Sequence, residues 1–261
     1  MAQALLYTSR MNVSLYQAAA ALDANSRWQD MISENLASSS VPGFRKQELA
    51  VAAVQAGLMP ATSGGSAKSP HFFVIPKATN STSFKAGDLQ YTGDDHNIAI
   101  EGKGFFQVQL PNGAIASTRD GEFQVSSQGQ LVTKEGYPVM GASGPIQLDV
   151  HNGTPLSISS NGEVSQGAQI KGKLNLVEYP KPELLKQISG AYFLGQGSQI
   201  QTQPSTSTVR QGYLEGSNTS TVTEMANMMT AMRTYEANTH VIQIQDDRLG
   251  KVISELGSTT N

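Results

Sequence analysis

The stretch NLASSSVPGFRKQ, residues 35–47, separates two kinds of sequence in this chain. Before it, apolar residues recur at alternating spacings of three and four, and neither proline nor glycine interrupts them. Such spacing is typical of a long amphipathic helix with a heptad-like seam. Pro42 cannot extend a helix and Gly43 permits a reversal of the backbone, so Pro42, Gly43 and Phe44 form a predicted exit turn. The next residues, Arg45 and Lys46, are interpreted either as a solvated pair or as an intersubunit contact.

The two ends of the chain carry the same apolar pattern. The predicted N-terminal helix occupies residues 1–44, and its seam consists of Met11, Leu15, Ala18, Leu22, Asn25, Ile32 and Leu36. The predicted C-terminal helix occupies residues 217–261, and its seam consists of Met225, Met228, Met232, Tyr235, Ile242, Leu249 and Ile253. Asn25 is a polar residue within the first seam and is expected to set the register of the helix. Because neither stripe has an obvious partner elsewhere in the chain, we expect the helices to pair with each other and with further copies.

The middle of the chain, residues 85–195, has the pattern of an all-β domain. Turn signals such as Asp120-Gly121 recur at short intervals, and the runs between them alternate polar and apolar residues. This alternation predicts half-buried antiparallel strands. Residues 45–84 are expected to be a linker or extended segment, flexible at 59–70, and residues 196–216 a connector, because small and polar residues dominate them. The expected fold is therefore mainly β with long terminal α-helices, in which the helices form a coiled-coil-like inner domain and many antiparallel strands an outer domain.

The composition excludes several classes of function. The chain has 261 residues, a net charge of −3 and 15% charged residues, so nothing favours binding to nucleic acid or to an anionic membrane. Without cysteine there is no disulfide, thiolate catalysis or cysteine-ligated metal. The longest apolar run, residues 49–54, is too short for membrane insertion. Asp94-Asp95-His96 is interpreted as a polar turn rather than a ligand cluster, so we expect neither a metal nor a cofactor.

Separated motifs resemble those of the bacterial flagellar rod, hook and hook-associated proteins. The family's Asn-Leu-Ala and Pro-Gly-Phe signature is similar to residues 35–44, although Glu34 and Ser38 stand where the family usually has asparagine. Within the β region, Thr118-Arg-Asp-Gly-Glu-Phe123 matches a further family motif. The remaining matched residues are Gly104, Phe105 and Phe106, then Glu215, Ser217 and Asn218, and finally Glu236 and Asn238. The resemblance covers nearly the whole chain, and its length fits a rod protein of the proximal or distal type.

The resemblance implies a structural subunit of the flagellar basal-body rod and not an enzyme. Such a subunit polymerises through its terminal helices into the hollow drive shaft that transmits torque and surrounds the export channel. It leaves the cell unfolded through the flagellar type III export apparatus without a cleaved signal peptide, which agrees with the lack of cysteine. The implied location is the periplasm-spanning rod of the basal body. The implied partners are further copies, other rod and hook proteins and the export apparatus, with the surrounding ring proteins as an additional candidate.

A second interpretation is a secreted β-rich cell-wall binding module or peptidoglycan hydrolase whose terminal helices dimerise. A hydrolase of this kind needs two carboxylates in one cleft. The acidic residues of the β region fall mostly in turns or at strand ends, and no helix is predicted there to bring them together. The sequence therefore favours the structural interpretation.

Overall fold

The computed structural model describes residues 2–59, 71–150, 154–195 and 201–258. The chain forms two compact units. We call residues 1–34, 47–81 and 221–261 the helical unit, and residues 35–46 and 82–220 the β-body. Both units are therefore assembled from segments that are distant in the sequence, so each needs long-range contacts to form.

The elements follow one another with these bounds. They are α1 (Ala2–Ala37), β1 (Gln47–Met59), β2 (His71–Thr82), β3 (Leu89–Tyr91), β4 (Ile98–Glu101), β5 (Phe105–Gln109), β6 (Ile115–Thr118), β7 (Phe123–Val125), β8 (Leu131–Thr133), β9 (Met140–Gly141), β10 (Gly144–Pro145), β11 (Leu156–Ile158), β12 (Glu163–Gln166), β13 (Gln169–Lys173), β14 (Leu176–Glu178), the 3-10 helix η1 (Pro182–Leu184), β15 (Leu185–Ser189), β16 (Tyr192–Gly195), β17 (Gln203–Pro204), β18 (Thr208–Gln211), β19 (Tyr213–Glu215) and α2 (Thr221–Ser258). The chain is thus mainly β with one long helix towards each end, as the sequence predicts.

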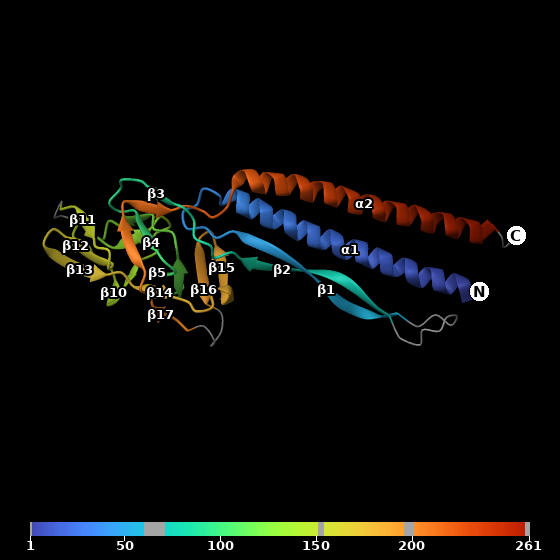
Figure 1. The fold of residues 1–261 in the computed structure, drawn as a ribbon, viewed down its shortest axis with the longest axis horizontal. Helices are drawn as coiled ribbons and strands as arrows, with labels where there is room; N and C mark the ends of the chain where they lie inside the picture. The colour runs from blue at the N-terminus through green and yellow to red at the C-terminus, as the bar shows by residue number, and fades with distance from the viewer. Residues whose placement is uncertain (1, 60–70, 151–153, 196–200, 259–261) are drawn as a thin grey trace. The chain divides into compact units, whose positions relative to one another are not determined.

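In the helical unit, α1 and α2 lie side by side (Figure 1). Their shared core consists of Met31, Ile32 and Ala231, with Trp28 and Met228 packed against it. The Asn25 side chain is buried and donates a hydrogen bond from Nδ2 to the Ala231 carbonyl oxygen at 3.0 Å. The two helices therefore pack along this stretch, while a coiled coil between them stays a prediction. Among the described residues, no helix has an apolar stretch that could cross a membrane.

The segment expected to be a linker or an extended segment contains two long strands. β1 and β2 pair with each other as a two-stranded sheet and belong to the helical unit. Leu49 of β1 packs against the helix core, which gives this segment a fixed place within the unit. From residue 60 onwards, the flexible linker predicted at residues 59–70 lies outside the described residues.

The β-body is centred on an antiparallel sheet of six strands in the order β15-β16-β6-β5-β14-β17. A three-stranded antiparallel sheet, β11-β12-β13, and several strand pairs complete it. Neighbouring residues of β5 point to opposite faces of the sheet and enter two different cores. Phe106 packs in the larger core, edge-on to Phe123, whereas Phe105 packs in a smaller core with Val177, Leu185 and Phe193.

The region predicted to be a connector, residues 196–216, contributes three short strands from residue 203 onwards. β17 pairs with β14, β18 with β4, and β19 with β3. In β18 one residue, Val209, is apolar; it opposes Ile100 and is buried. The neighbouring Arg210 forms an exposed ion pair with Glu101. A strand stabilised by backbone pairing and one buried valine leaves little apolar signal in the sequence.

Candidate functional site

The exit turn after α1 is held in a fixed conformation by the β-body. The helix ends at Ala37, and the backbone N–H of Ser39 and of Val41 donate to the carbonyl oxygens three residues earlier. Gly43 has φ +68°, and a Cβ placed on it would lie 2.3 Å from the Arg119 carbonyl carbon. Its N–H donates to the Glu215 carbonyl oxygen at 2.7 Å. Only glycine fits this position, both because of its φ and because the neighbouring backbone is so close.

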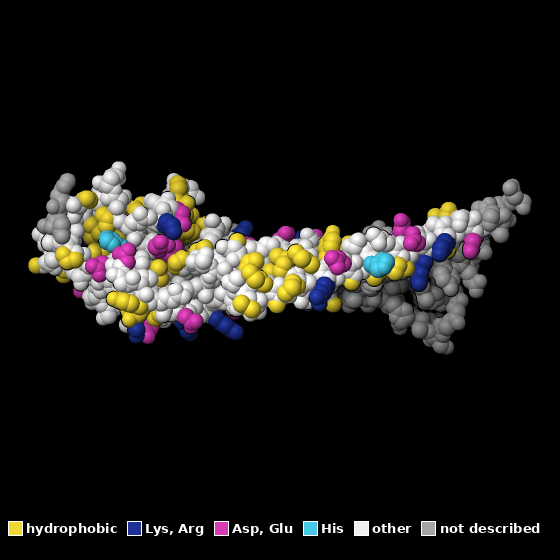
Figure 2. Space-filling view, turned by 90° about the horizontal axis from the view of Figure 1, so that it is seen from above, with side chains coloured by type: hydrophobic (Ala, Val, Ile, Leu, Met, Phe, Trp, Pro, Cys, Tyr) yellow, Lys and Arg dark blue, Asp and Glu magenta, His cyan; other side chains and the backbone are white. Residues whose placement is uncertain are grey.

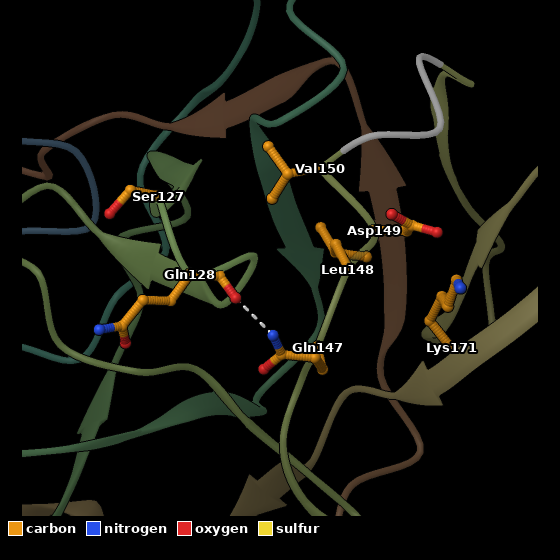
Figure 3. Close-up of a pocket in the computed structure, with 7 residues that line it drawn as sticks. All are labelled: Ser127, Gln128, Gln147, Leu148, Asp149, Val150 and Lys171. Atoms are coloured by element: carbon orange, nitrogen blue, oxygen red, sulfur yellow. Dashed lines mark hydrogen bonds between the residues drawn. The ribbon is translucent and has the colours of Figure 1, made fainter.

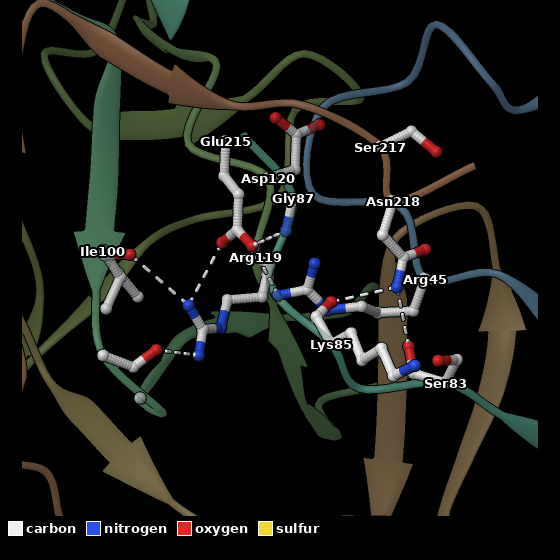
Figure 4. A network of polar contacts seen from close by, with 12 residues as sticks. Arg45, Ser83, Lys85, Gly87, Ile100, Arg119, Asp120, Glu215, Ser217 and Asn218 are labelled. Atoms are coloured by element: carbon white, nitrogen blue, oxygen red, sulfur yellow. Dashed lines mark hydrogen bonds and ion pairs between the residues drawn. The ribbon is translucent and has the colours of Figure 1, made fainter. Parts of the chain in front are cut away.

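Arg45, Arg119 and Glu215, which we call the Glu215 clamp, form a buried ionic network (Figure 4). Arg45 Nη2 lies 2.6 Å from Glu215 Oε1, and Arg119 Nη1 lies 3.1 Å from Glu215 Oε2. The Gly87 N–H also donates to Glu215 Oε1 at 2.9 Å. One carboxylate thus joins the segment after α1, the end of β6 and the segment before α2. Removing one partner of such a buried network leaves an uncompensated charge.

The position of Arg45 differs from the interpretation of Arg45-Lys46 as a solvated pair. The Arg45 side chain is only 1% exposed and reaches Glu215, 170 residues away in the sequence. The guanidinium group is therefore buried against Glu215 and not solvated. No local pattern could have revealed this, because the burial depends on the distant carboxylate. For Arg119, the resemblance to the family motif at residues 118–123 was the available signal.

Asn218, a few residues after Glu215, forms a second set of hydrogen bonds between separate segments of the β-body (Figure 4). The Lys46 N–H donates to Asn218 Oδ1 at 2.7 Å, and Asn218 Nδ2 donates to the carbonyl oxygens of Ser83 and Lys85, both at 2.9 Å. The Ser217 hydroxyl accepts a hydrogen bond from the Thr219 N–H at 3.1 Å. The Glu-x-Ser-Asn motif therefore ties together the segments on either side of β1 and β2 just before α2 begins.

The other motif residues have separate positions. The Gly104 N–H donates to the Ser207 hydroxyl at 3.0 Å, and a Cβ on Gly104 would lie 2.7 Å from Ser205 Oγ. Glu236 is exposed on α2, and Asn238 is half-buried near α1. Hence the motif residues of the β-body have structural roles in the free chain, whereas Glu236 faces outward.

The predicted seam of α1 faces inward where its side chains are described. Asn25 and Ile32 are buried, and Ala18, Leu22 and Leu36 are half-buried. The side chains of Met11 and Leu15 lie outside the described part of the helix. Pro42 is half-buried in the exit turn and Phe44 is fully buried. The role of these residues in subunit contacts stays a prediction.

The predicted seam of α2 divides between two faces. Met228, Ile242 and Leu249 are half-buried, whereas Met225, Met232, Tyr235 and Ile253 are exposed. The face turned inward carries Glu224 and Ala231, which are buried. A small residue such as Ala231 permits close approach of α1. The predicted seam includes residues of both faces, since Met228 packs against the helix core while Met225 and Met232 are exposed.

Part of the outward face of α2 is a continuous apolar stripe, which we call the Met stripe. It consists of Val222, Met225, Met229 and Met232, which are 78%, 51%, 58% and 52% exposed. Their spacing of three and four places them on one side of the helix. Figure 2, seen from the side of α2, shows hydrophobic side chains gathered over the first part of this helix. A row of large exposed apolar residues marks an interaction surface.

An apolar groove lies elsewhere in the helical unit. It has a volume of about 560 Å³ and is lined by Ala21, Ala24, Asn25, Trp28, Leu49, Val51, Thr234 and Asn238. Its lining includes no charged side chain. The helical unit thus presents two uncharged surfaces, the groove and the Met stripe, that differ in shape.

The described residues offer no paired carboxylates suited to glycoside hydrolysis. In one hollow, Asp94 is paired with His96 and Glu122 with Lys134. Hydrogen bonds from His96 lower the pKa of Asp94, the opposite of what a general acid needs. A second hollow, of about 430 Å³, has Asp149 as its one carboxylate (Figure 3). In the described part of the chain, no group of three or more potential ligands could hold a metal ion.

One buried carboxyl group has an unusual environment. Asp120 is 7% exposed, and burial raises its pKa to about 7, although the Glu122 N–H donates to its Oδ1 at 2.9 Å. The nearby Glu122 and Glu135 carboxylates add to the increase. Glu135 accepts a hydrogen bond from the Tyr192 hydroxyl, and this bond together with burial raises the pKa of Tyr192. The Asp120 carboxyl group is buried in the β-body and its pKa is raised. The stability of that unit therefore depends on pH.

Two long terminal helices and a β-body that contains the Glu215 clamp suit a structural protein. The model of the flagellar hook protein FlgE/F/G D1 domain matches residues 99–166, and that of the flagellar basal body rod FlgEFG protein C-terminal region matches residues 210–255. The chain belongs to the family of flagellar basal-body rod proteins, which are structural proteins of the flagellum and not enzymes.

The curated relatives extend this similarity over most of the chain. The flagellar basal-body rod protein FlgG of Buchnera aphidicola subsp. Acyrthosiphon pisum is 33% identical, with 92% of this chain and 98% of the relative covered. The rod protein FlgF of Caulobacter vibrioides is 33% identical over 85% of this chain and 92% of its own length. The rod protein FlgF of Escherichia coli is 31% identical over 92% and 97%. Relatives of both kinds match about equally, so the similarity points to the rod family as a whole.

Proposed function

We propose that this protein is a rod subunit that polymerises through its terminal helices into the hollow shaft of the flagellar basal body. Membership of the rod family supports the location and the assembly with other rod and hook proteins. In this proposal α1 and α2 form a coiled-coil-like inner layer around the export channel, and the β-body lies outside it. The shaft transmits torque, and the subunit arrives unfolded through the export apparatus, a route compatible with the lack of cysteine. Contacts of the β-body with the surrounding ring proteins are part of the same proposal.

The observation that carries this proposal is the Met stripe. A free chain gains nothing from exposing Val222, Met225, Met229 and Met232 side by side. Covering a methionine fully is worth roughly 1.5–3 kcal/mol. An open helical assembly needs two different surfaces on each subunit, and the stripe and the apolar groove are two such surfaces. The clamp serves the proposed assembly as well, because it joins, within the β-body, the segment that follows α1 to the segment that precedes α2.

The test substitutes the methionines of the Met stripe in the protein that the native cell produces. The triple variant Met225→Gln, Met229→Gln and Met232→Gln keeps side-chain length and helix propensity but removes the apolar contact. We expect basal bodies purified from this strain to contain little of the variant by mass spectrometry, and the cells to stop swimming. The matched control changes three exposed apolar residues of the β-body, Val150, Ile170 and Leu184, to glutamine. Normal incorporation and swimming of the stripe variant would contradict the proposal.

A further inference from the structure

The Glu215 clamp is not electrically balanced. Two buried guanidinium groups face one carboxylate, and the structure leaves several of their nitrogens unused. Among the described residues, Arg45 Nε, Arg45 Nη1 and Arg119 Nε are buried without a hydrogen-bond partner. Arg119 is partly compensated, because its Nη2 donates to the Gly102 carbonyl oxygen at 2.6 Å and its guanidinium lies 5.0 Å from the Phe105 ring centre. Arg45 has no such compensation beyond Glu215.

Both arginines line one cavity of the β-body, with a volume of about 570 Å³. Its walls are largely aromatic and apolar, formed by Phe84, Phe105, Tyr179, Pro180 and Pro182. Cavities of this size that combine apolar walls with a few convergent polar groups are typical ligand sites. Lys103 and Glu178 complete the set of charged lining residues. Together with Glu215, three cations and two carboxylates surround the space, so one positive charge is in excess.

We propose that this cavity binds a carboxylate group carried on an apolar or aromatic body. A carboxylate supplies one negative charge and two acceptor oxygens, which match the planar donor fork of a guanidinium group. The aromatic walls accommodate the apolar body. A doubly charged phosphate would exceed the available positive charge and would face Glu178 as well. The ligand is therefore either an acidic side chain of a neighbouring subunit or a small free organic acid.

The electrostatics of Arg119 agree with this assignment. Burial and the nearby Arg45 lower the pKa of Arg119 to about 10, although Glu215 opposes both effects. The guanidinium remains charged at neutral pH but in an environment that disfavours its charge. A bound carboxylate relieves this cost, because it brings a second counter-charge to the two arginines.

The test uses benzoate as the probe and benzamide as its neutral counterpart of nearly the same shape. Both are titrated into the free full-length chain by calorimetry. We expect benzoate to bind and benzamide to bind at least roughly tenfold more weakly, since only benzoate brings a charge. Equal binding of the two, or no binding of benzoate, would overturn the proposal. Because the chain is not assembled in this experiment, the result does not depend on the proposed polymerisation.

Two substitutions in the lining of the cavity leave the Glu215 clamp unchanged. One removes a positive charge from the lining and the other removes a negative charge. Lys103→Gln removes an exposed cation and should weaken benzoate binding roughly threefold to fivefold, whereas Glu178→Gln should strengthen it by a similar factor. Unchanged thermal unfolding of both variants shows that folding is preserved. Identical benzoate affinities in both variants and the natural chain would place the probe elsewhere and overturn the assignment.

An assembly assay then distinguishes the two sources of the carboxylate. If the natural ligand is an acidic side chain of another subunit, benzoate competes with it and slows assembly of the purified chain, while benzamide does not. If the ligand is a small free acid, benzoate occupies the cavity and assembly continues at the same rate. Either outcome agrees with a carboxylate site and identifies its occupant.

Discussion

The helical unit and the β-body bury their apolar residues to very different extents. The β-body has a continuous core that runs through most of its strands, with Phe106, Val108, Leu131 and Val139 almost completely buried. Among the side chains that the structure describes in the helical unit, the core cluster consists of Met31, Ile32 and Ala231, and the two helices are each more than 35 residues long. Helical stability in proteins comes mainly from packing of an apolar face. We therefore expect the β-body to be stable by itself and, under the proposed assembly, the helices to depend on further contacts with other copies.

The strongest test of the β-body concerns its clamp. Glu215→Gln keeps the shape of the side chain but leaves Arg45 and Arg119 buried without a counter-charge. We expect the β-body to lose about 3–5 kcal/mol of stability, measured by urea unfolding with tyrosine fluorescence. The control is Glu101→Gln, which breaks the exposed pair with Arg210 and should cost no more than about 1 kcal/mol. A loss as small as that of the control would show that the clamp does not stabilise the fold.

A pair of core truncations compares the two units directly. Phe106→Ala should destabilise the free chain by about 3–5 kcal/mol, because Phe106 is fully buried in the larger core. Ile32→Ala also removes a fully buried side chain, but we expect it to shift the unfolding of the free chain by less than about 1 kcal/mol. Its effect should appear in assembly instead. Equal losses from the two substitutions in the free chain would mean that the helical unit is stable alone.

Gly43 in the exit turn has a matched control in Gly113, which lies in the turn between β5 and β6. Gly43→Ala meets both a positive φ and the Arg119 backbone, so strain alone should cost about 1–3 kcal/mol and the clash should add to it. Gly113 also has a positive φ, but a Cβ there meets nothing within 4 Å. Gly113→Ala should therefore show the cost of the φ angle without the clash. Thermal unfolding of both variants measures the difference, and a similar loss in the two would remove the close approach as the cause.

Asp120 is expected to make the stability of the β-body depend on pH. Its pKa is about 7 in the folded state and 3.8 for the ordinary group, so the folded protein binds the proton more tightly. Stability is therefore highest below about pH 4 and is lost as pH rises towards 7, by on the order of 1 kcal/mol per pH unit. Asp120→Asn should remove this decline and make the chain more stable than its parent at pH 8. Parallel curves for both proteins between pH 4 and 8 would exclude Asp120 as the source.

The sequence was sufficient for the elements that carry a periodic pattern. The spacing of three and four predicted a long helix towards each end, and the Ser and Pro-Gly punctuation predicted that the first helix stops near residues 38–43. The alternation between residues 85 and 195 predicted the antiparallel body. These predictions depend only on the spacing of nearby residues, which is why they could be made without knowledge of the tertiary structure.

Other features could not be predicted because they depend on residues far apart in the chain. Arg45 has the sequence context of an exposed charge and becomes buried only because Glu215 lies beside it. β18 has one inward-facing valine, and its pairing with β4 supplies the rest of its stability. In α2, the predicted seam includes the exposed Met225 and Met232, although the small Ala231 marks the face that packs within the chain. The burial of alanine and the exposure of methionine depend on the distance between the two packed helices. The spacing of apolar residues along the sequence does not give this distance.

Hydrogen exchange followed by mass spectrometry tests the contrast between the two units most directly. The free chain, at a concentration where it is monomeric, is compared with the assembled form. We expect amides of β4, β5, β6 and β16 to be strongly protected in both, and amides of α1 and α2 to exchange rapidly in the free chain and slowly after assembly. Helix amides that are as protected as the β-body in the free monomer would contradict the account, because the helices would then need no other copy to be stable.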